Sequence, residues 1–259
     1  MRAQERRPAA AGLRFALWHR RQVAPPDRIR QTARMPDSLS RALNDLDEQA
    51  FQALYGRWDP LKPPEVAALL AASGVRWYIA GGRAARLGAP PRHHGDTDVV
   101  IRYEDVAALR DALAGDWHLW EAHDGALRPL LPGCELTPDR EQLWARRDAG
   151  QPWQLDLPLD RRSTDSEWVF KRDAGIRLSW DQALQVADGI SYLRPEIALL
   201  HKARLDRPKD RADLAAAVLE PEARDWLATM LHRLGHAEWA ELARGGGVRP
   251  VRYGPNHDR

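Results

Sequence analysis

The spacing of apolar residues changes along the chain, and each change marks an expected secondary-structure element. Leucines recur at roughly helical spacing over 37–55, and 65–73 reads as a second helix that ends at Gly74. The pattern then contracts to a run of aromatic and β-branched residues over 75–80, which predicts a strand. Helices are therefore expected before the first strand.

The middle of the chain alternates short apolar runs with turn residues. Strands are expected over 97–101 and 117–122, with a helix over 103–113 between them. A β-hairpin is expected around Asp148-Ala149-Gly150. The remaining strand candidates are 143–147 and 153–157, which form this hairpin, and the short pieces 168–170 and 190–192.

From Pro195 onward the pattern is helical. Proline suits the first position of a helix, and helices are expected over 196–205, 209–219 and 222–234. Helices, a mixed sheet and then more helices favour the α+β class. We expect a small mixed or antiparallel sheet with flanking helices, followed by a helical C-terminal region. The expected segments are a leader over 1–34, a first domain over 35–193, the helical region over 194–245 and a loose tail over 246–259.

Composition narrows the class of protein. The 259 residues carry 39 basic and 37 acidic side chains, a formal charge of +2. Positions 1–34 hold nine arginines against two acidic residues, so the other 225 residues carry 30 basic and 35 acidic side chains. We expect this leader to be disordered or to lie upstream of a native start at Met35. A mildly acidic body gives no electrostatic case for nucleic-acid binding.

Cysteine content and hydropathy point to a cytoplasmic protein. The single cysteine, Cys134, excludes an internal disulfide framework, and no activating pattern surrounds it. No apolar run approaches the roughly 20 residues that span a bilayer. Membrane association is therefore not expected.

Two aspartates mark the start of the strand over 97–101. Asp96 and Asp98 are separated by one residue, so their side chains lie on the same side of an extended chain. Adjacent carboxylates repel each other unless a cation lies between them, and such oxygen ligands favour Mg²⁺. The alternative is a pair of solvated aspartates at a strand end.

Two further motifs flank this pair. Gly81-Gly82 follows the strand over 75–80, and its bare backbone can approach an anionic ligand, with Arg83 next to it. The alternative is a plain tight turn. Asp156 lies between two leucines in a strand, so it faces away from them, either into a site or onto the wet face of an edge strand.

The helical C-terminal region contains two of the four lysines of the chain, Lys202 and Lys209. Lysine is a compact point charge that suits phosphate oxygens. Asp210 and Asp213 are three residues apart, so they share a helix face. The alternative is an ordinary charged helix surface.

Together these motifs resemble the nucleotidyltransferase superfamily of the DNA-polymerase-β type, whose pattern is Gly-Gly or Gly-Ser, a D-x-D strand and a third carboxylate. The segments IAGGRAARLG, HHGDTDVVI, LWARRDAGQPWQLDL and YLRPEIALLHKARLDRPKDRADL are similar to the aminoglycoside 2''-adenylyltransferase-like branch. The resemblance implies that Asp96, Asp98 and Asp156 are catalytic metal ligands. It also implies that Lys202, and with it Lys209, contacts the triphosphate.

The resemblance implies an enzyme that uses Mg²⁺, with two ions, and ATP or another nucleoside triphosphate. It would move a nucleoside monophosphate to a hydroxyl of a small, cationic acceptor such as an aminoglycoside, an antibiotic-resistance-like activity. The alternatives are a toxin-type nucleotidyltransferase acting on tRNA or protein, and a non-catalytic nucleotide-binding relative. Acidic residues near predicted strand ends are candidate amine contacts: Glu121, Asp124, Asp148 and Asp160.

Aromatic and histidine residues add weaker candidates. Trp120, Trp144 and Trp153 are candidates for the lining of a cleft, although most of the 11 tryptophans are expected in the core. His93-His94 precede Asp96, but no further His or Cys spacing completes a zinc site.

Overall fold

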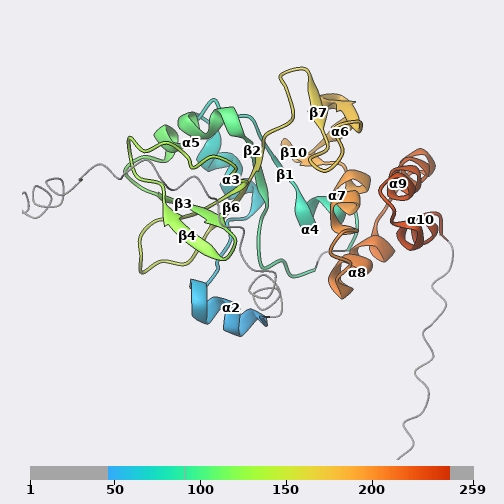
Figure 1. Ribbon diagram of the computed structural model, residues 1–259, viewed down its shortest axis with the longest axis horizontal. Coiled ribbons are helices and arrows are strands. Elements are labelled where there is room, and N and C mark those ends of the chain that lie inside the picture. The colour runs from blue at the N-terminus through green and yellow to red at the C-terminus, as the bar shows by residue number, and fades with distance from the viewer. Residues whose placement is uncertain (1–45, 91, 246–259) are drawn as a thin grey trace, which may run out of the picture.

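A mixed sheet of eight strands forms the centre of the protein in the computed structural model, which describes residues 46–90 and 92–245 (Figure 1). The strand order is β4-β3-β5-β6-β2-β1-β10-β9. The pairs β2–β6 and β1–β10 are parallel, and the other pairs in this sheet are antiparallel. Its strands are β1 (Trp77–Ile79), β2 (Val99–Arg102), β3 (His118–His123), β4 (Ala126–Pro129), β5 (Gln142–Arg146), β6 (Leu155–Asp160), β9 (Leu184–Ala187) and β10 (Ile190–Leu193).

Helices flank this sheet, and α7 to α10 gather beyond its β1 side (Figure 1). Proline occupies the first turn of α3, α7, α8 and α9, where its missing N–H costs no helical hydrogen bond. The described helices are α2 (Glu48–Tyr55), α3 (Pro63–Leu70), α4 (Gly81–Ala85), α5 (Val106–Leu113), α6 (Trp180–Ala183), α7 (Pro195–Lys202), α8 (Pro208–Ala216), α9 (Pro221–Arg233) and α10 (Ala237–Ala243). A separate hairpin is formed by β7 (Glu167–Val169) and β8 (Arg177–Ser179).

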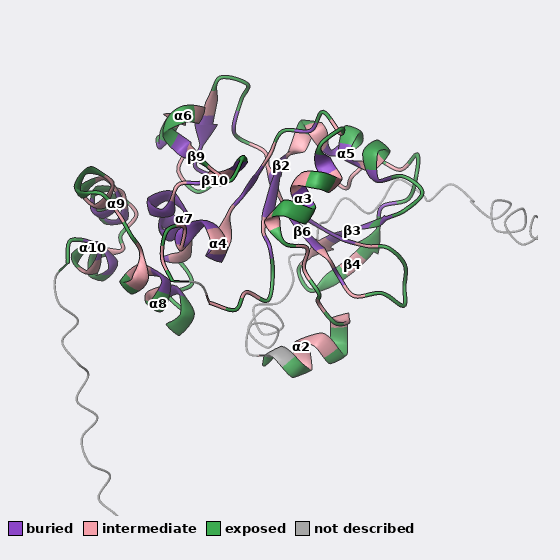
Figure 2. Ribbon diagram, turned by 180° about the vertical axis from the view of Figure 1, so that it is seen from behind, coloured by how far each residue is buried: buried purple, intermediate pink, exposed green. Residues whose placement is uncertain are grey.

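The central strands bury both faces, as the colouring of Figure 2 shows. Ile79, Val99 and Ile101 pack with α3 and α5 on one face. Tyr78 and Val100 point to the other face and pack with α4, α7 and α9. Because side chains alternate along a strand, each central strand contributes to both hydrophobic clusters.

The fold class expected from the sequence, α+β with a mixed sheet and a helical C-terminal region, is confirmed. The first expected helix is described only as α2, since its earlier residues, like 1–34 and 246–259, lie outside the described part of the chain. The sequence patterns did not reveal β4, β8, α6 and β9, which are only three or four residues long. Such short elements leave too few apolar positions to show a period.

The chain passes from the sheet to the C-terminal helices between Leu193, where β10 ends, and Pro195, where α7 starts. One hydrophobic cluster contains residues from both sides of this point, including Val100 and Leu227. Among the described residues, no helix is both long and apolar enough to cross a membrane.

Candidate nucleotide-binding and carboxylate site

The turn after β1 is built so that a carboxylate lies against a bare backbone. The N–H of Ala80 donates a 2.9 Å hydrogen bond to the carbonyl oxygen of Asp98. Gly81 has a φ of +59°, and a Cβ at this position would lie 1.7 Å from Asp98 Oδ2. Glycine is therefore required at Gly81, both for the backbone conformation and for the space that Asp98 occupies.

Asp98 and Asp156 are neighbours across the sheet, joined by a parallel bridge between the starts of β2 and β6. Asp156 is 8% exposed, while Leu155 and Leu157 are fully buried in the core on the opposite face. The alternation expected from the sequence thus places Asp156 on the face where Asp98 lies. Gln142 Nε2 donates a 2.6 Å hydrogen bond to Asp156 Oδ1 and fixes this carboxylate.

The two carboxylates perturb each other. Burial, and after it the charge of Asp96, raises the pKa of Asp98 to about 6, although Lys202, Arg207 and Lys209 act against this shift. Burial and the charge of Asp98 raise the pKa of Asp156 well above its usual range. Two ionised oxygens in this position need a cation between them, so the donor set fits a hard divalent ion such as Mg²⁺.

Asp96 differs from the other two carboxylates because it is exposed, on the loop before β2. Within 46–90 and 92–245, no group of three or more His, Cys, Asp or Glu side chains is arranged to hold a metal ion. The predicted ligand set of Asp96, Asp98 and Asp156 therefore consists of a close pair and one carboxylate on a neighbouring loop.

Arg83, which follows the two glycines, turns toward the aspartate loop. Its Nε donates a 2.8 Å hydrogen bond to the hydroxyl of Thr97, the buried residue between Asp96 and Asp98. Burial lowers the pKa of Arg83, while the charges of the two aspartates oppose this shift. The guanidinium therefore lies beside the carboxylates and braces the loop that carries them.

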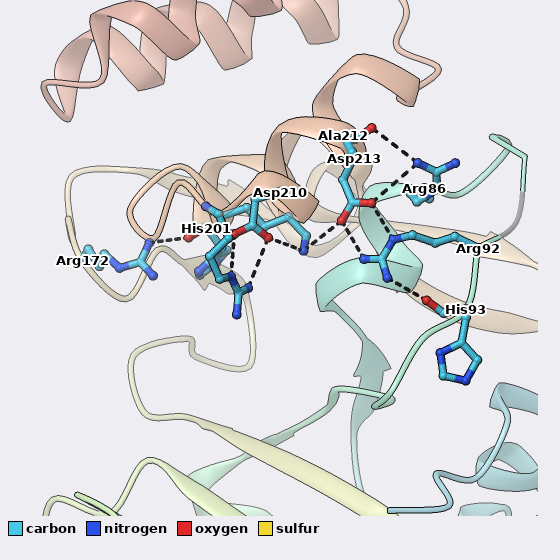
Figure 3. Close-up of polar contacts among 10 residues, drawn as sticks. Arg86, Arg92, His93, Arg172, His201, Asp210, Ala212 and Asp213 are labelled. Atoms are coloured by element: carbon cyan, nitrogen blue, oxygen red, sulfur yellow. Dashed lines mark hydrogen bonds and ion pairs between the residues drawn. The ribbon is translucent and has the colours of Figure 1, made fainter. Parts of the chain in front are cut away.

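A buried charge cluster surrounds Asp210 and Asp213, which Figure 3 shows together with Arg86 and Arg92. Lys202, the last residue of α7, belongs to this cluster. Its side chain is 9% exposed, and Nζ lies 3.1 Å from both Asp210 Oδ1 and Asp213 Oδ2. Both aspartates are fully buried on α8. The shared helix face expected for them is confirmed, but they bind cations instead of forming a solvated surface. Lys209 itself is exposed.

Arginines complete this cluster, and the sequence analysis did not find them. Arg92 binds Asp213 through Nε and Nη2 at 2.8 and 2.9 Å, and Arg86 Nη1 lies 3.6 Å from the same carboxylate. Arg207 Nε donates a 2.7 Å hydrogen bond to Asp210. We call the six residues the Asp213 cluster: Arg86, Arg92, Lys202, Arg207, Asp210 and Asp213. Arg207 is three residues from Asp210, whereas Arg86 and Arg92 are more than 100 residues from Asp213, and for these two no local pattern indicates the contact.

A cavity of about 230 Å³ opens beside Gly81 and Asp98. Trp168 and His201 line it, together with the basic side chains of Lys171 and Arg172. Asp160, one of the candidate amine contacts, also lines it and accepts hydrogen bonds from the N–H groups of Arg162 and Ser163. The cavity extends the candidate site across the sheet toward β1, in the direction opposite to β5.

On the other side of Asp156 the same face is aromatic. Trp144 lies directly opposite Asp156 in the β5–β6 pair, and Trp120 lies opposite Trp144 in the β3–β5 pair. These two tryptophans therefore share a face with the carboxylate, while Trp153 packs against both rings, at 5.5 and 6.0 Å. Two of the buried indole N–H groups, those of Trp120 and Trp144, have no hydrogen-bond partner within 46–90 and 92–245.

Glu121 does not fit the expected role of an amine contact. Its strand register places it opposite Leu143, on the sheet face away from Asp156. It is 1% exposed, accepts a 2.8 Å hydrogen bond from the N–H of Thr137, and is paired with Arg128 and Arg140. Adjacent residues of a strand point to opposite faces of the sheet, so lying near a strand end does not tell whether a side chain faces the site.

Comparison with known proteins returned solved structures only, since no family model and no curated protein matches the chain. The antibiotic-resistance factor ANT(2'')-Ia in its solution structure is 17% identical, with a TM-score of 0.34 over 70% of this chain and 86% of that one. ANT(2'')-Ia in complex with adenylyl-2''-tobramycin is 14% identical, with a TM-score of 0.35 over 70% and 94%. An antigenic nucleotidyltransferase-like protein from Paracoccidioides brasiliensis is 16% identical, with a TM-score of 0.33 over 69% and 89%.

At these low identities and TM-scores, the ligand and the activities named for the three neighbours are statements about those proteins and not about this chain.

Proposed function

We propose that this chain is a nucleotidyltransferase that moves a nucleoside monophosphate from ATP or another nucleoside triphosphate to a hydroxyl group and releases pyrophosphate. One observation carries this proposal: the adjacent carboxylates of Asp98 and Asp156 lie against the Gly81 turn, with the buried Lys202 close enough to lower the pKa of Asp98. This arrangement joins a site for a divalent cation to a site for phosphate oxygens.

Asp96, Asp98 and Asp156 would hold Mg²⁺, whose chemistry when bound is to neutralise phosphate charge and stabilise the attacking and leaving oxygens. The missing Cβ at Gly81 leaves room for the Asp98 carboxylate against the turn that would receive the phosphate. Lys202, with Lys209 nearer the solvent, supplies positive charge for the triphosphate. Arg83 braces the loop that carries Asp96.

In the transfer step the hydroxyl oxygen of the acceptor bonds to the α-phosphorus, the bond from the α-phosphorus to the bridging oxygen breaks, and pyrophosphate leaves. Asp156 takes the proton of the hydroxyl on a carboxylate oxygen. Gln142, which donates a hydrogen bond to Asp156 Oδ1, orients this carboxylate for the proton.

The proposed acceptor is a small cationic molecule such as an aminoglycoside. The net charge of the residues after position 34 is negative, and Asp160 lines the cavity beside Asp98. A toxin-type transfer to tRNA or protein is the second candidate. The half-buried ring of Trp120, on the same sheet face as Asp156, favours it, because nucleobases stack on aromatic rings.

The test is transfer of radiolabel from the α-phosphate of each of the four nucleoside triphosphates to a panel of aminoglycosides, bulk tRNA and protein, with Mg²⁺. Label on an aminoglycoside supports the first acceptor class, and label on tRNA alone replaces it while leaving the chemistry intact. Asp98→Asn should abolish transfer, and Asp111→Asn, on the exposed side of α5, should not. Full activity of Asp98→Asn would refute the function.

A further inference from the structure

Arg92 lies on the loop between α4 and β2, and its guanidinium packs on the turn proposed to receive phosphate. A Cβ on Gly82 would lie 2.7 Å from Arg92 Nη2 and 2.9 Å from His94 Nδ1. The loop therefore covers the second glycine so closely that no side chain fits beneath it. A cation in this position faces the same bare backbone as an incoming anion would.

Asp213 holds that cation in place. Both of its oxygens accept hydrogen bonds from Arg92, and one of them also lies 3.1 Å from Lys202 Nζ. Asp213 is fully buried, so its charge is tolerated only because cations pair with it. Arg92 and Asp213 are 121 residues apart, and their pair ties the loop over Gly82 to α8.

We propose that Arg92 is a further triphosphate-binding residue of this chain, and that Asp213 positions Arg92 and Lys202 together before the nucleotide binds. The proposal rests on the nucleotidyl transfer proposed above, and it adds a residue that the motifs did not include. Asp213 acts through the two cations and is a positioning residue.

The charge balance of the Asp213 cluster supports an anionic ligand. Four cations, Arg86, Arg92, Lys202 and Arg207, share two carboxylates, which leaves two positive charges in excess. The ammonium of Lys202 has three donors and uses two of them on the aspartates. Arg92 has five donors, of which Nε and one hydrogen of Nη2 bind Asp213 and one of Nη1 binds the His93 carbonyl. Both side chains are thus fixed and can still donate to phosphate oxygens.

The competing explanation is that Asp213 only fastens α8 to the rest of the fold. The two explanations differ in their effect on anion affinity. A fastening role predicts that loss of Arg92 lowers stability and leaves polyphosphate binding unchanged. A positioning role predicts weaker binding in a protein that is still folded.

The experiment titrates the full chain with inorganic tripolyphosphate in the presence of EDTA, by calorimetry, so that neither metal nor acceptor is needed. Arg92→Gln should weaken binding about tenfold to a hundredfold, the effect expected for hydrogen bonds to a charged group. Arg92→Lys keeps the positive charge but not the paired N–H donors of the guanidinium. Its affinity for tripolyphosphate should lie between those of wild type and Arg92→Gln. The matched controls are Arg233→Gln and Asp173→Asn, an arginine–aspartate pair of the same two-bond geometry elsewhere, and both should bind as wild type does.

A double-mutant cycle of Arg92 and Asp213 tests whether Asp213 acts on anion binding by positioning Arg92. Asp213→Asn should weaken binding, and adding Arg92→Gln to it should weaken binding much less than Arg92→Gln does alone, because the two substitutions disrupt one unit. Fully additive losses would overturn the positioning role of Asp213. If Asp213→Asn does not fold, Arg92→Gln and Arg92→Lys decide the proposal, since the Arg92 side chain is 28% exposed.

Wild-type affinity for tripolyphosphate in Arg92→Gln would overturn the proposal. That result is distinct from failure of the proposed function, because transfer of α-label by the wild-type chain can still be measured. Conversely, tripolyphosphate binding that depends on Arg92, in a chain that transfers no label to any acceptor, would support the anion site and count against the transferase.

Discussion

Two pairs of aspartates in this protein have opposite electrostatic surroundings. Asp98 and Asp156 lie beside each other with no cation bonded to either carboxylate within the described residues. Burial raises the pKa of both, and the charge of Asp96 adds to this at Asp98 and the charge of Asp98 at Asp156. The side chains of Asp210 and Asp213 are inaccessible to solvent, yet hydrogen bonds and charges from Lys202 and arginines outweigh their desolvation and lower the pKa of both.

The difference assigns separate tasks to the two pairs. Carboxylates that repel each other gain most from an added cation, which suits a metal site. Carboxylates already saturated by cations gain nothing from a metal, but they hold those cations where an anion can meet them. The first pair is thus expected to cost stability and support chemistry, and the second to support the fold and the binding of phosphate.

The largest expected effect comes from breaking the first pair. Asp98→Asn should reduce nucleotidyl transfer by about a thousandfold or more, because it removes a ligand and a charge from a site that works by electrostatics. The same change should leave the free energy of unfolding unchanged or raise it by about 1 kcal/mol, since it relieves the repulsion with Asp156. Label transfer and urea unfolding measure the two quantities on one sample. A clear loss of stability would contradict this interpretation of the pair.

Breaking the second pair should instead lower the free energy of unfolding. Asp213→Ala leaves Arg92 and Lys202 without their buried partner, and such a loss costs about 3–5 kcal/mol of unfolding free energy. Asp173→Ala removes the surface partner of Arg233 and should cost far less, because solvent screens an exposed ion pair. Urea unfolding compares the two, and equal costs would argue against a structural role for the Asp213 cluster.

The next prediction changes the contact between the first pair and the glycine turn. Gly81→Ala places a methyl group on Asp98 Oδ2 and should displace this carboxylate, which we expect to reduce transfer about a hundredfold. Gly133→Ala is the control, because Gly133 has a φ of +78° with no atom within 4 Å of its Cβ position. Both variants should lose stability from backbone strain, but only Gly81→Ala should lose activity. Equal activities would show that Asp98 tolerates the displacement.

The contrast also explains what the sequence could predict. The direction of Asp156 was predictable, because strand alternation is local and two leucines flank this aspartate. Its contact with Asp98 depends on the pairing of two strands that are distant in sequence, and only the family resemblance implied it. The Asp213 cluster was found only in part. Lys202 and the two aspartates lie on consecutive helices within 12 residues of chain. Arg92 and Arg86 reach them from more than 100 residues away. No periodicity records a contact of that kind.

Errors of register had a similar cause. Glu121 was taken for a site residue because it lies near the end of a strand, but which face it occupies depends on the pairing of β3 with β5. Short elements such as β9 and α6 were not identified, because three or four residues do not establish a period. Local alternation was thus predictable, and long-range pairing was not.

The smallest expected effect concerns His201, which lies beside Lys202 on α7 and lines the cavity at Asp98. Burial, and after it the charges of Arg172 and Lys171, lowers the pKa of His201 to about 3. An unfolded histidine has a pKa of about 6.5, so between these values the unfolded chain takes up a proton that the folded chain excludes. The contribution of His201 to stability is therefore fully present above about pH 6.5 and falls as the pH is lowered toward 3.

His201→Gln removes this titration, so the difference in unfolding free energy between wild type and variant should change by up to about 1.4 kcal/mol per pH unit in that window. His118→Gln, at an exposed position on β3, is the control and should leave the slope of wild type unchanged. The measurement is urea unfolding at pH 7.5, 6 and 5. Parallel curves for wild type and His201→Gln would mean that the imidazole can take a proton in the folded state. The His201 ring would then be more accessible to water, through the cavity beside Asp98, than its packing against Phe170 indicates.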